Sequence, residues 1–446
     1  MSEQPKNQQR TAIIYFGPTQ QDYQHLVEAE KRPAFIDFIQ SPLQQQLGRE
    51  LHRHDCACTS HYTVHQWRER TLEGWFGQVE TFNIARVRCG GCGTVFTVLP
   101  SFILRYRRQD TDCLSKVLTL SMQMGLRHTA LVYSWSGANR LWSPGWVWNL
   151  IQWLGTLLPL ALLLVRLGLT APPHVLSDEK FARLDGKRIY LFMVSQGELI
   201  WHIEWLSNLN EASFEPAICR FLSSVEQSRQ IHREGEPESN YGPQTVNTDG
   251  WRPAQNAWKS KVPPIKLSEC LLHGHKRIDS TLTDYFAVHP EMSPQQQKQL
   301  KHEFDHVLDA PSLAAYSQRV RRLGEAYPDE ELLQARLEIL KDKRFLFTNH
   351  LQFPEASAVS APLDRSMRFL DEKLQIFGQF RVGDKINATL NAWGIVNNLR
   401  AFLPDAQKAG QSLVEAFGAK LRGIPWMEAL NLCTVGCLDK LVPASG

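Results

Sequence analysis

Runs of apolar residues rich in β-branched and aromatic side chains, bounded by polar positions, predict a set of β-strands in the middle of the chain. Two such runs, Lys187–Ser195 and Glu198–Leu206, are joined by Gln196-Gly197, which predicts a β-hairpin. A shorter strand is expected at His174–Glu179, and another begins at Thr245. Both of these shorter strands are expected to end at acidic residues.

Helical patterns alternate with these strands. Glu211–Val225 and Pro253–Lys259 have the spacing of helices, and a further strand is expected to end at Leu271-Leu272. The predicted order is β-β-β-α-β-α-β, which indicates a mixed α/β fold. A mostly helical, charged stretch from about Ser293 to Leu346 follows, and it predicts an insertion packed on this core.

Three short helical segments precede the strands. They are predicted at about Asp112–Met124, at about Arg127–Ser136 and from Ser143-Pro144 onward, where serine would cap a helix with proline at its first position. Gly125 and Gly137 separate the segments. This arrangement is typical of a helix-turn-helix, whose last helix enters the major groove of DNA. A trihelical module with a purely structural role fits the same residues.

A leucine-rich segment, Trp153–Leu169, is the best candidate for a membrane span. Pro159 and Arg166 interrupt it, and its apolar core is shorter than the ~20 residues that a span requires. A buried connecting helix is therefore expected, without a membrane partner. The first residues, Met1–Lys6, contain no apolar signal region, and the nine cysteines are an odd number. We therefore expect a reduced, cytoplasmic protein.

Two closely spaced cysteine pairs lie upstream of the helical segments. The pairs consist of Cys56, Cys58, Cys89 and Cys92. The second pair has the form of a zinc knuckle, and the strand-like run Glu80–Arg88 between the pairs is typical of a zinc ribbon. The first pair has one intervening residue, so His54 or His61 could replace one of its cysteines as a ligand. A structural Zn²⁺ is expected, and four unligated thiols in a small core are the alternative.

Positive charge is concentrated in one short segment of the chain, although the net charge of the whole chain is small. The 446 residues, 43% hydrophobic and 21% charged, suffice for two or three domains, and their formal net charge is +3. Five arginines crowd one short segment: Arg86, Arg88, Arg105, Arg107 and Arg108. Such a cluster predicts contact with a polyanion such as DNA, although a solvated basic face is an equally simple interpretation.

Two aspartates follow the short predicted strands. Asp249 lies on the turn Asp249-Gly250, and Asp178 ends the strand that begins at His174. In a ribonuclease H-like fold the predicted order places the first and fourth strands side by side, so these carboxylates would be neighbours. Adjacent carboxylates repel each other unless a cation lies between them. Oxygen ligands of this kind suit Mg²⁺ or Mn²⁺.

A third acid is then expected on a later helix. The best candidate is Asp364, because Ser360-Ala361-Pro362 before it reads as the start of a helix. Glu355 and Asp371 are the alternatives for this position.

Residues from about 50 to 430 together resemble a bacterial DDE-type transposase of the insertion-sequence kind. The resemblance rests on the paired cysteines, Ser177-Asp178-Glu179-Lys180, Thr248-Asp249-Gly250-Trp251 with Ala254-Gln255-Asn256-Ala257, Cys270-Leu271-Leu272-His273, Pro362-Leu363-Asp364-Arg365 with Met367-Arg368-Phe369-Leu370, and Asn391-Ala392-Trp393 with Asn397-Asn398. The family's third acid is usually glutamate, so Asp364 would make this chain a DDD variant.

The resemblance implies an α/β fold: a ribonuclease H-like mixed sheet with a helical insertion, preceded by a small zinc ribbon and an all-α helix-turn-helix region. The expected domains are an N-terminal segment at 1–50, a zinc-ribbon-like module at 51–110, the helix-turn-helix and connecting helix at 111–170, the catalytic domain at 171–400 with its insertion at about 285–350, and a C-terminal helical tail at 401–446.

The resemblance also implies metal-dependent cleavage of DNA at transposon ends, then transfer of the freed 3′-hydroxyl into target DNA. Two Mg²⁺ or Mn²⁺ ions per active site would be held by Asp178, Asp249 and Asp364, with Asp178 as the bridging ligand. Arg365 and Arg368, at helical spacing beside Asp364, are candidates for phosphate contact, and a solvated helix face is an equally simple interpretation. The protein would act as a homo-oligomer on DNA and associate with the nucleoid. The alternatives are a catalytically inactive DNA-binding derivative and a nuclease of the same fold that does not join strands.

Two further motifs have more than one interpretation. Cys270 and His273 could form a metal half-site, although packing or DNA contact is the preferred role. Trp251, Trp258 and Trp393 could stack on flipped bases, although aromatic residues of this kind are usually part of a core.

Overall fold

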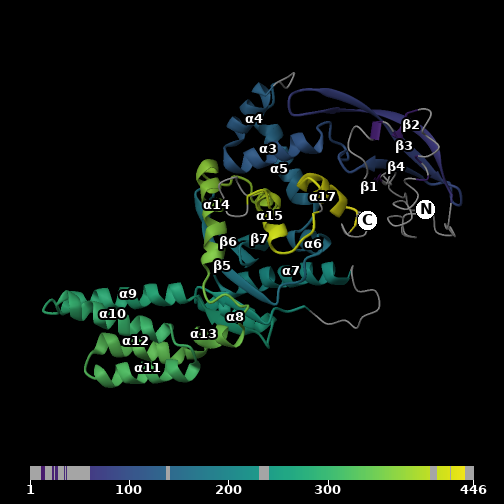
Figure 1. Cartoon of the computed structure of the whole chain (residues 1–446). Coiled ribbons are helices and arrows are strands. Elements are labelled where there is room, and N and C mark those ends of the chain that lie inside the picture. The colour runs from purple at the N-terminus through teal and green to yellow at the C-terminus, as the bar shows by residue number, and fades with distance from the viewer. Residues whose placement is uncertain are drawn as a thin grey trace, which may run out of the picture. The chain divides into compact units, whose positions relative to one another are not determined.

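The structure is a computed structural model of the chain. It describes residues 12–15, 23–24, 26–28, 35, 37, 61–136, 141–230, 241–401, 409–421 and 423–436. The chain divides into two compact units (Figure 1). The first unit comprises residues 1–170 and 391–446, and the second comprises residues 171–390. The sequence predicts a catalytic domain that extends to residue 400, ten residues beyond the end of the second unit.

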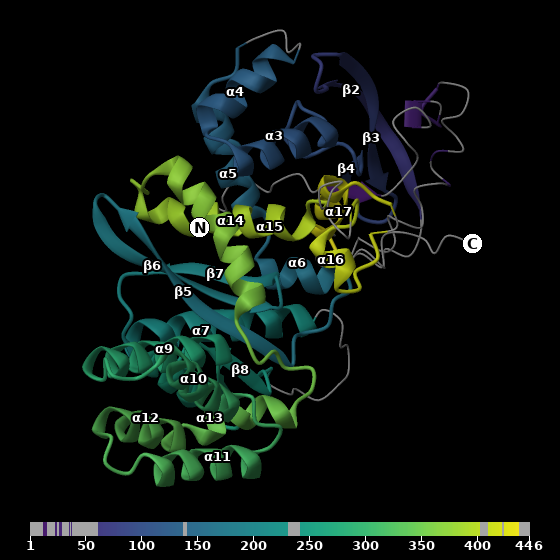
Figure 2. The ribbon, with the colours of Figure 1, turned by 60° about the vertical axis from the view of Figure 1, so that its left-hand side comes forward.

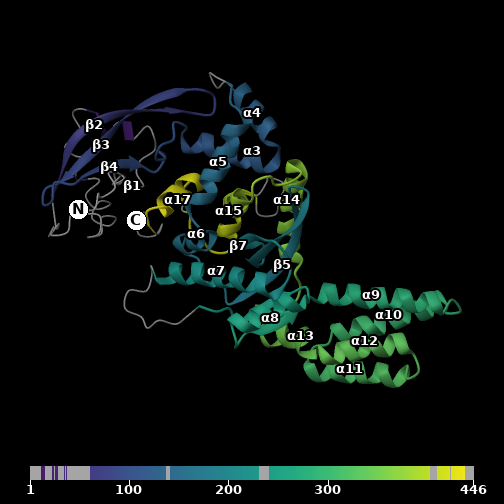
Figure 3. The same ribbon diagram turned by 180° about the vertical axis from the view of Figure 1, so that it is seen from behind.

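The first unit contains a sheet with the strand order β1-β4-β3-β2 among its described residues. Its strands are β1 (Ala12–Tyr15), β2 (Tyr62–Glu73), β3 (Val79–Cys89) and β4 (Val95–Pro100). The antiparallel pair β2 and β3 forms a long hairpin, visible from behind in Figure 3. Strand β3 lies within one residue of the run predicted at 80–88, because the alternation of buried and exposed positions is visible in its sequence.

The helices predicted in the first unit are confirmed. They are α3 (Thr111–Gln123), α4 (Leu126–Trp135), α5 (Pro144–Leu157) and α6 (Leu160–Arg166). Helix α5 begins as its sequence indicates: the Ser143 side chain accepts a hydrogen bond from Trp146 N at 3.1 Å, and proline occupies the first turn. The short helices α16 (Leu413–Ala416) and α17 (Trp426–Cys433) belong to the same unit, and Ser101 Oγ donates to Glu428 Oε2 at 2.6 Å.

The leucine-rich segment is divided between α5 and α6, which meet at a bend of 65° next to Pro159. None of the described helices is long and apolar enough to cross a membrane alone, and only this bent pair has the length and composition when taken together. Leu163 and Leu164 on α6 are fully buried, as expected for a connecting helix inside a protein core.

The second unit is built on a sheet with the order β7-β6-β5-β8-β9 (Figure 2). Its strands are β5 (His174–Leu184), β6 (Lys187–Gln196), β7 (Leu199–Leu206), β8 (Thr245–Thr248) and β9 (Lys266–Glu269). Strands β5, β6 and β7 are antiparallel neighbours, and β8 and β9 run parallel to β5. The first and fourth strands of this unit are therefore neighbours, as their order in the sequence predicts.

Two strand ends differ from the prediction. Strand β5 does not stop at Glu179 but continues to Leu184, because β6 pairs with it along this whole length. Strand β9 ends at Glu269, not at Leu271-Leu272. Leu271 instead begins helix α9 (Leu271–Val288), whose apolar residues continue the strand's hydrophobic pattern and hide the boundary.

The two faces of the sheet are covered by different helices. On one face, Trp258 of α8 (Arg252–Lys261) donates from Nε1 to Ser177 Oγ at 3.2 Å, and α8 packs against α7 (Glu211–Gln230). Lys180, an odd number of residues from Ser177 along β5, points to the other face, where it pairs with Asp371 of α14 (Ala361–Phe377) at 2.6 Å. Asp178 has the same parity as Lys180, so it lies on the face of α14.

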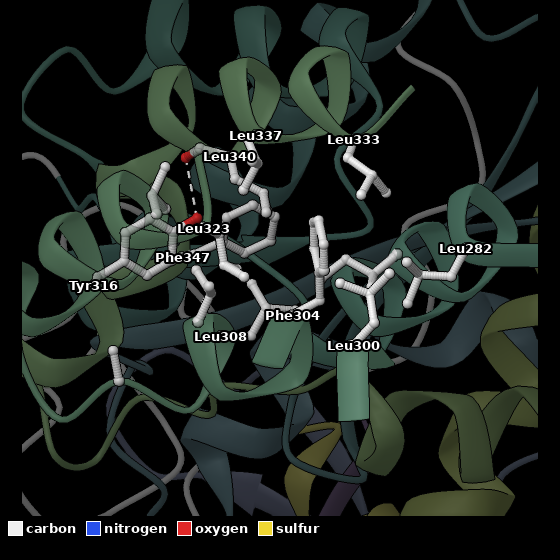
Figure 4. Close-up of a cluster of buried hydrophobic side chains, with 14 of the residues drawn as sticks. Leu282, Leu300, Phe304, Leu308, Tyr316, Leu323, Leu333, Leu337, Leu340 and Phe347 are labelled. Carbon is white, nitrogen blue, oxygen red and sulfur yellow. Dashed lines mark hydrogen bonds between the residues drawn. The ribbon is translucent and has the colours of Figure 1, made fainter. Parts of the chain in front are cut away.

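The predicted insertion is a helical bundle with its own core (Figures 1 and 4). After α9 it contains α10 (Pro294–Leu308), α11 (Leu313–Ala326), α12 (Glu331–Asp342) and α13 (Arg344–Thr348). Buried residues of all five helices pack together, among them Phe304, Tyr316 and Phe347. Ile278 and Leu282 of α9 are part of this core, so the bundle begins well before residue 285, directly after the sheet.

Candidate metal centre

The two aspartates predicted to meet do so at one end of the parallel strands. In the register of β5 and β8, Leu176 lies opposite Asn247, so Asp178 and Asp249 are each two residues beyond the same point. Asp178, Glu179 and Asp249 each offer a carboxylate oxygen within 4.8 Å of the other two. Among the described residues, these three form a group of metal-ligating side chains. Glu179 is the member that was not predicted as a ligand.

The electrostatics of this group indicate missing positive charge. Burial raises the pKa of Asp178 to about 7, and the charges of Asp249 and Asp364 act in the same direction, against a hydrogen bond from Glu179 N at 2.7 Å. Burial, with the charges of Asp178 and Asp249, also raises the pKa of Glu179 well above its ordinary value. No described lysine or arginine forms an ion pair with any of the three carboxylates. Such a group needs protons or a cation to be stable.

Asp249 is held in place by its own turn. Its Oδ1 accepts a hydrogen bond from Trp251 N at 2.8 Å, which closes the turn after β8. Gly250 has a φ of 96°, and a Cβ added there would lie 2.5 Å from the carboxyl carbon of Glu269. Glycine is therefore required at this position both for its backbone conformation and for the space beside Glu269.

Glu269 is a fourth carboxylate at the same sheet edge, opposite Thr248 in the register of β8 and β9. Its side chain is fully buried and pairs with Arg277, and Lys343 Nζ lies 2.8 Å from Oε2. Arg277 also donates to the main-chain oxygen of Asp249, so it connects the buried carboxylate to the turn. Burial, together with the charge of Arg277, lowers the pKa of Lys343 to about 8. The expected strand end at Leu271-Leu272 concealed this residue, because it placed Glu269 inside the strand.

Asp364 lies in the first turn of α14 and is exposed. Its charge contributes to the raised pKa of Asp178, and its Oδ2 lies 3.4 Å from Ser360 Oγ. It is not in the group whose oxygens lie within 4.8 Å of one another. Of the two alternatives, Asp371 is paired with Lys180, and Glu355 is exposed and interacts electrostatically with His174. Asp364 therefore remains the candidate for the third acid, because its charge raises the pKa of Asp178.

Cys270 and His273 link the start of α14 to the acidic group. Cys270 Sγ accepts hydrogen bonds from Ser360 N at 3.1 Å and from Ser360 Oγ at 3.2 Å. Burial raises the pKa of this thiol, but hydrogen bonds from His273 and Ser360 outweigh burial and lower it. The hydrogen bond with Cys270, and then the charges of Asp178 and Asp249, raise the pKa of His273. These contacts fit a packing role, one of the two roles, packing or DNA contact, preferred for the pair.

The predicted zinc site is only partly covered. Cys56, Cys58 and His54 lie outside the described residues. Cys89 is buried at the end of β3, and Cys92 is half-buried in the turn that follows, where Gly93 N donates to Cys89 O at 2.9 Å. The main-chain oxygen of the exposed His61 accepts from Gly90 N at 2.8 Å, so the chain entering β2 passes beside this turn.

Most of the predicted arginine cluster lines one hollow of the first unit, with a volume of about 860 Å³. Its arginines are Arg68, Arg70, Arg86, Arg105, Arg107 and Arg108, and its acids are Glu69 and Glu73. Arg88 does not line it. Arg68 and Arg70 were not predicted, because only the pairing of β2 with β3 brings them to the hollow that Arg86 also lines. In the second unit, Arg365 pairs with Glu198 at 2.5 Å, and Arg368 is exposed.

Comparison with known sequences adds one finding. A family model described as a domain of unknown function (DUF6431) matches residues 56–129. The matched segment runs from the first cysteine pair through β2, β3, β4 and α3 into α4. No curated protein matches the chain. The match therefore covers three strands of the sheet, helix α3 and the start of α4, and the family's function is undefined.

Proposed function

We propose that the chain is a DNA transposase that cleaves DNA at transposon ends and transfers the 3′-hydroxyl into target DNA, with Mg²⁺ or Mn²⁺ as cofactor. The observation that carries the proposal is the group of Asp178, Glu179 and Asp249: three buried or half-buried carboxylates that form no ion pair with a described lysine or arginine. Perturbed acids that converge at a sheet edge are typical of functional sites.

The donor set fits a hard divalent cation. Asp178, Glu179 and Asp249 would hold it through carboxylate oxygens, which Mg²⁺ and Mn²⁺ prefer over nitrogen and sulfur. Asp364 would complete the set from α14. When bound, such ions stabilise the charge that develops on the reacting oxygens of a phosphodiester.

Other residues of the second unit would orient this site. Arg277, fixed by buried Glu269, holds the main chain of Asp249, and Gly250 allows the turn to lie against Glu269. Asn247 Nδ2 donates to Ser357 O at 2.9 Å and thereby ties β8 to the segment that leads into α14. Asp249 and Asp364 would thus be positioned by contacts that do not depend on the metal.

Two further features support a transposase. The strand order β7-β6-β5-β8-β9, with three antiparallel strands and two parallel ones, is the order expected for a ribonuclease H-like sheet. The arginine-lined hollow of the first unit suits a phosphate backbone. We infer a homo-oligomer on paired DNA ends from the resemblance alone.

The proposal is tested by incubating the full chain with end-containing DNA and Mg²⁺ or Mn²⁺, and by scoring nicking and strand joining separately. We expect both activities, and we expect Asp249→Asn to reduce them by at least about 1,000-fold. Asp185→Asn is the matched control, because Asp185 is exposed in the turn that follows β5, seven residues beyond Asp178, and has a φ of 47° that asparagine adopts readily.

Each rival function predicts a different outcome. DNA binding without nicking would indicate a catalytically inactive derivative, which the exposed position of Asp364 favours. Nicking without joining would indicate a nuclease. Activity that survives Asp249→Asn would refute the proposed mechanism.

A further inference from the structure

The rim of the arginine-lined hollow carries an aromatic residue in an unusual conformation. Tyr106 has a φ of 62°, a region that residues other than glycine, asparagine and aspartate seldom adopt. Its side chain is 78% exposed, and the guanidinium of Arg105 lies 4.7 Å from the centre of its ring. The fold thus presents this ring to solvent in a conformation that costs free energy, and an exposed ring is available to contact a ligand.

The turn that presents Tyr106 is held rigidly. Arg107 N donates to Leu104 O at 3.3 Å and closes the turn. Arg70 of β2 then donates to Leu104 O at 2.7 Å and to Arg107 O at 2.6 Å. One guanidinium therefore binds the first and the last residue of this turn. Arg107 is fixed in addition by Trp153, whose ring centre lies 4.3 Å from its guanidinium. Arg70 and Arg107 therefore act as supports for Tyr106.

Tyr106 lines two hollows that differ in their other residues. One is the arginine-lined hollow, to which Arg68 and Arg86 contribute from the sheet. The other is a hollow of about 530 Å³ that Leu141, Trp142 and Trp146 line together with Tyr106. Leu141 is 84% exposed, and the rings of Trp142 and Trp146 are 4.1 Å apart. Arg107 and Arg108 line both hollows.

This alternation of charge and aromatic surface matches a nucleic acid strand with unpaired bases. Arginines track the phosphates, and aromatic rings stack on bases whose faces are accessible. In a continuous duplex the base faces are covered by their neighbours, so an exposed ring such as Tyr106 gains nothing from it. Of the tryptophans singled out in the sequence, Trp258 and Trp393 are buried and cannot offer this surface, and Trp251 belongs to the second unit.

We propose that the first unit contains a binding site for single-stranded DNA, in which Tyr106 stacks on an unpaired base, the arginine-lined hollow holds the adjoining phosphates and the aromatic hollow accepts the next base. The proposal takes from the proposed function only that the nucleic acid is DNA. It predicts that the protein prefers DNA with an unpaired extension to blunt duplex.

Binding is measured by fluorescence anisotropy on the full chain in EDTA, with a blunt duplex and with the same duplex extended by about six thymidines. The extended probe should bind more tightly than the blunt one. Tyr106→Ala should weaken binding of the extended probe by about 10-fold and leave the blunt duplex within about 2-fold. Tyr106→Phe, which keeps the ring, should bind like the wild type, and thermal unfolding of both variants checks that they fold.

The phosphate part of the site has its own variant. Arg68→Gln should weaken binding of both probes and reduce the slope of log K against log salt by about one. Equal affinity of wild type and Tyr106→Ala for the extended probe would overturn the proposal. So would an equal loss on the blunt duplex, or tighter binding of an oligouridine than of an oligothymidine.

The two proposals fail in different ways. Because EDTA removes divalent metal, binding is measured without cleavage. A protein that binds the extended probe through Tyr106 but never nicks DNA with Mg²⁺ or Mn²⁺ would refute the transposase and leave this site intact. If the protein nicks and joins DNA but Tyr106 contributes nothing to binding, the proposed transposase stands and the single-strand site is refuted.

Discussion

Two carboxylate environments lie side by side at the same sheet edge and are neutralised in different ways. Glu269, at the end of β9, is completely buried and is paired with Arg277 and Lys343. Asp178 and Asp249, at the corresponding level of β5 and β8, have no such partner among the described residues, and burial raises the pKa of Asp178 to about 7. Glu269 thus forms direct ion pairs with cationic side chains, whereas Asp178 and Asp249 form none with a described lysine or arginine.

This difference separates a structural acid from a functional one. A buried carboxylate with a structural role is best paired with positively charged side chains, because an unpaired buried charge lowers the stability of the fold. A carboxylate that binds a metal must keep its oxygens available. The turn at Gly250 joins the two environments, because Arg277 contacts both Glu269 and the main chain of Asp249.

The largest change in stability is expected when the structural acid loses its charge. Glu269→Gln leaves Arg277 and Lys343 without their partner, and removing one member of a buried pair costs about 3–5 kcal/mol. Because Arg277 is 35% exposed, we expect the free energy of unfolding to fall by about 2–3 kcal/mol, measured by urea unfolding. Glu338→Gln is the control: its pair with Lys341 is exposed, and no measurable change is expected. Similar losses in both variants would contradict the distinction.

The next largest effect is expected at the glycine between the two environments. In Gly250→Ala the new Cβ meets both a positive φ and the Glu269 carboxylate, so the substitution should destabilise the protein and displace Asp249. Gly186→Ala is the matched control, because Gly186 also has a positive φ but no atom within 4 Å of the added Cβ. We expect Gly250→Ala to cost at least about 1 kcal/mol more than Gly186→Ala in thermal unfolding. Equal costs would show that Glu269 does not constrain the turn.

The role of the third acid is tested by comparing two aspartates of α14. Asp364→Asn should reduce DNA nicking by about 10- to 100-fold, less than Asp249→Asn, because Asp364 is exposed and lies outside the tight group. Asp371→Asn should change nicking little, since Asp371 is already paired with Lys180. The reverse order of the two variants would assign the third position to Asp371.

The smallest effect is a pH dependence of the metal-free protein. The pKa of Asp178 is raised from 3.8 to about 7 in the folded state, so the stability that its proton contributes is present below pH 4 and is lost as the pH rises through 7. Asp178→Asn removes this titration. In EDTA the variant should melt about 3–6 °C above the wild type at pH 8, with a smaller difference at pH 5.

Metal should reverse that order, because only the wild type gains from it at pH 8. A difference between variant and wild type that does not change with pH would show that Asp178 is not perturbed. A variant that gains as much melting temperature from Mn²⁺ as the wild type would remove Asp178 from the ligand set.

Much of the second unit could be predicted from its sequence because its local signals agree. The hairpin at Gln196-Gly197 and the turn at Asp249-Gly250 are encoded by residues that favour those conformations, and the strand order then brings Asp178 next to Asp249. The start of helix α5 could equally be predicted from its serine cap and the proline that follows.

The features that were missed depend on tertiary register or on unfavourable local choices. Glu269 was hidden because β9 has four residues and the apolar start of α9 follows at once. Arg68 joins the arginine-lined hollow only through the pairing of β2 with β3. Tyr106 occupies a turn position with positive φ, where glycine or asparagine is usual. The neighbouring sequence therefore does not predict its conformation.

The central claim is that Asp178, Glu179 and Asp249 hold a divalent cation. It is tested most directly by titrating the full chain with Mn²⁺ and measuring free and bound ion by electron paramagnetic resonance. We predict that Asp249→Asn weakens Mn²⁺ binding by at least about 10-fold, while Asp185→Asn, in the turn that follows β5, binds like the wild type. Equal Mn²⁺ affinity of Asp249→Asn and the wild type would contradict the claim.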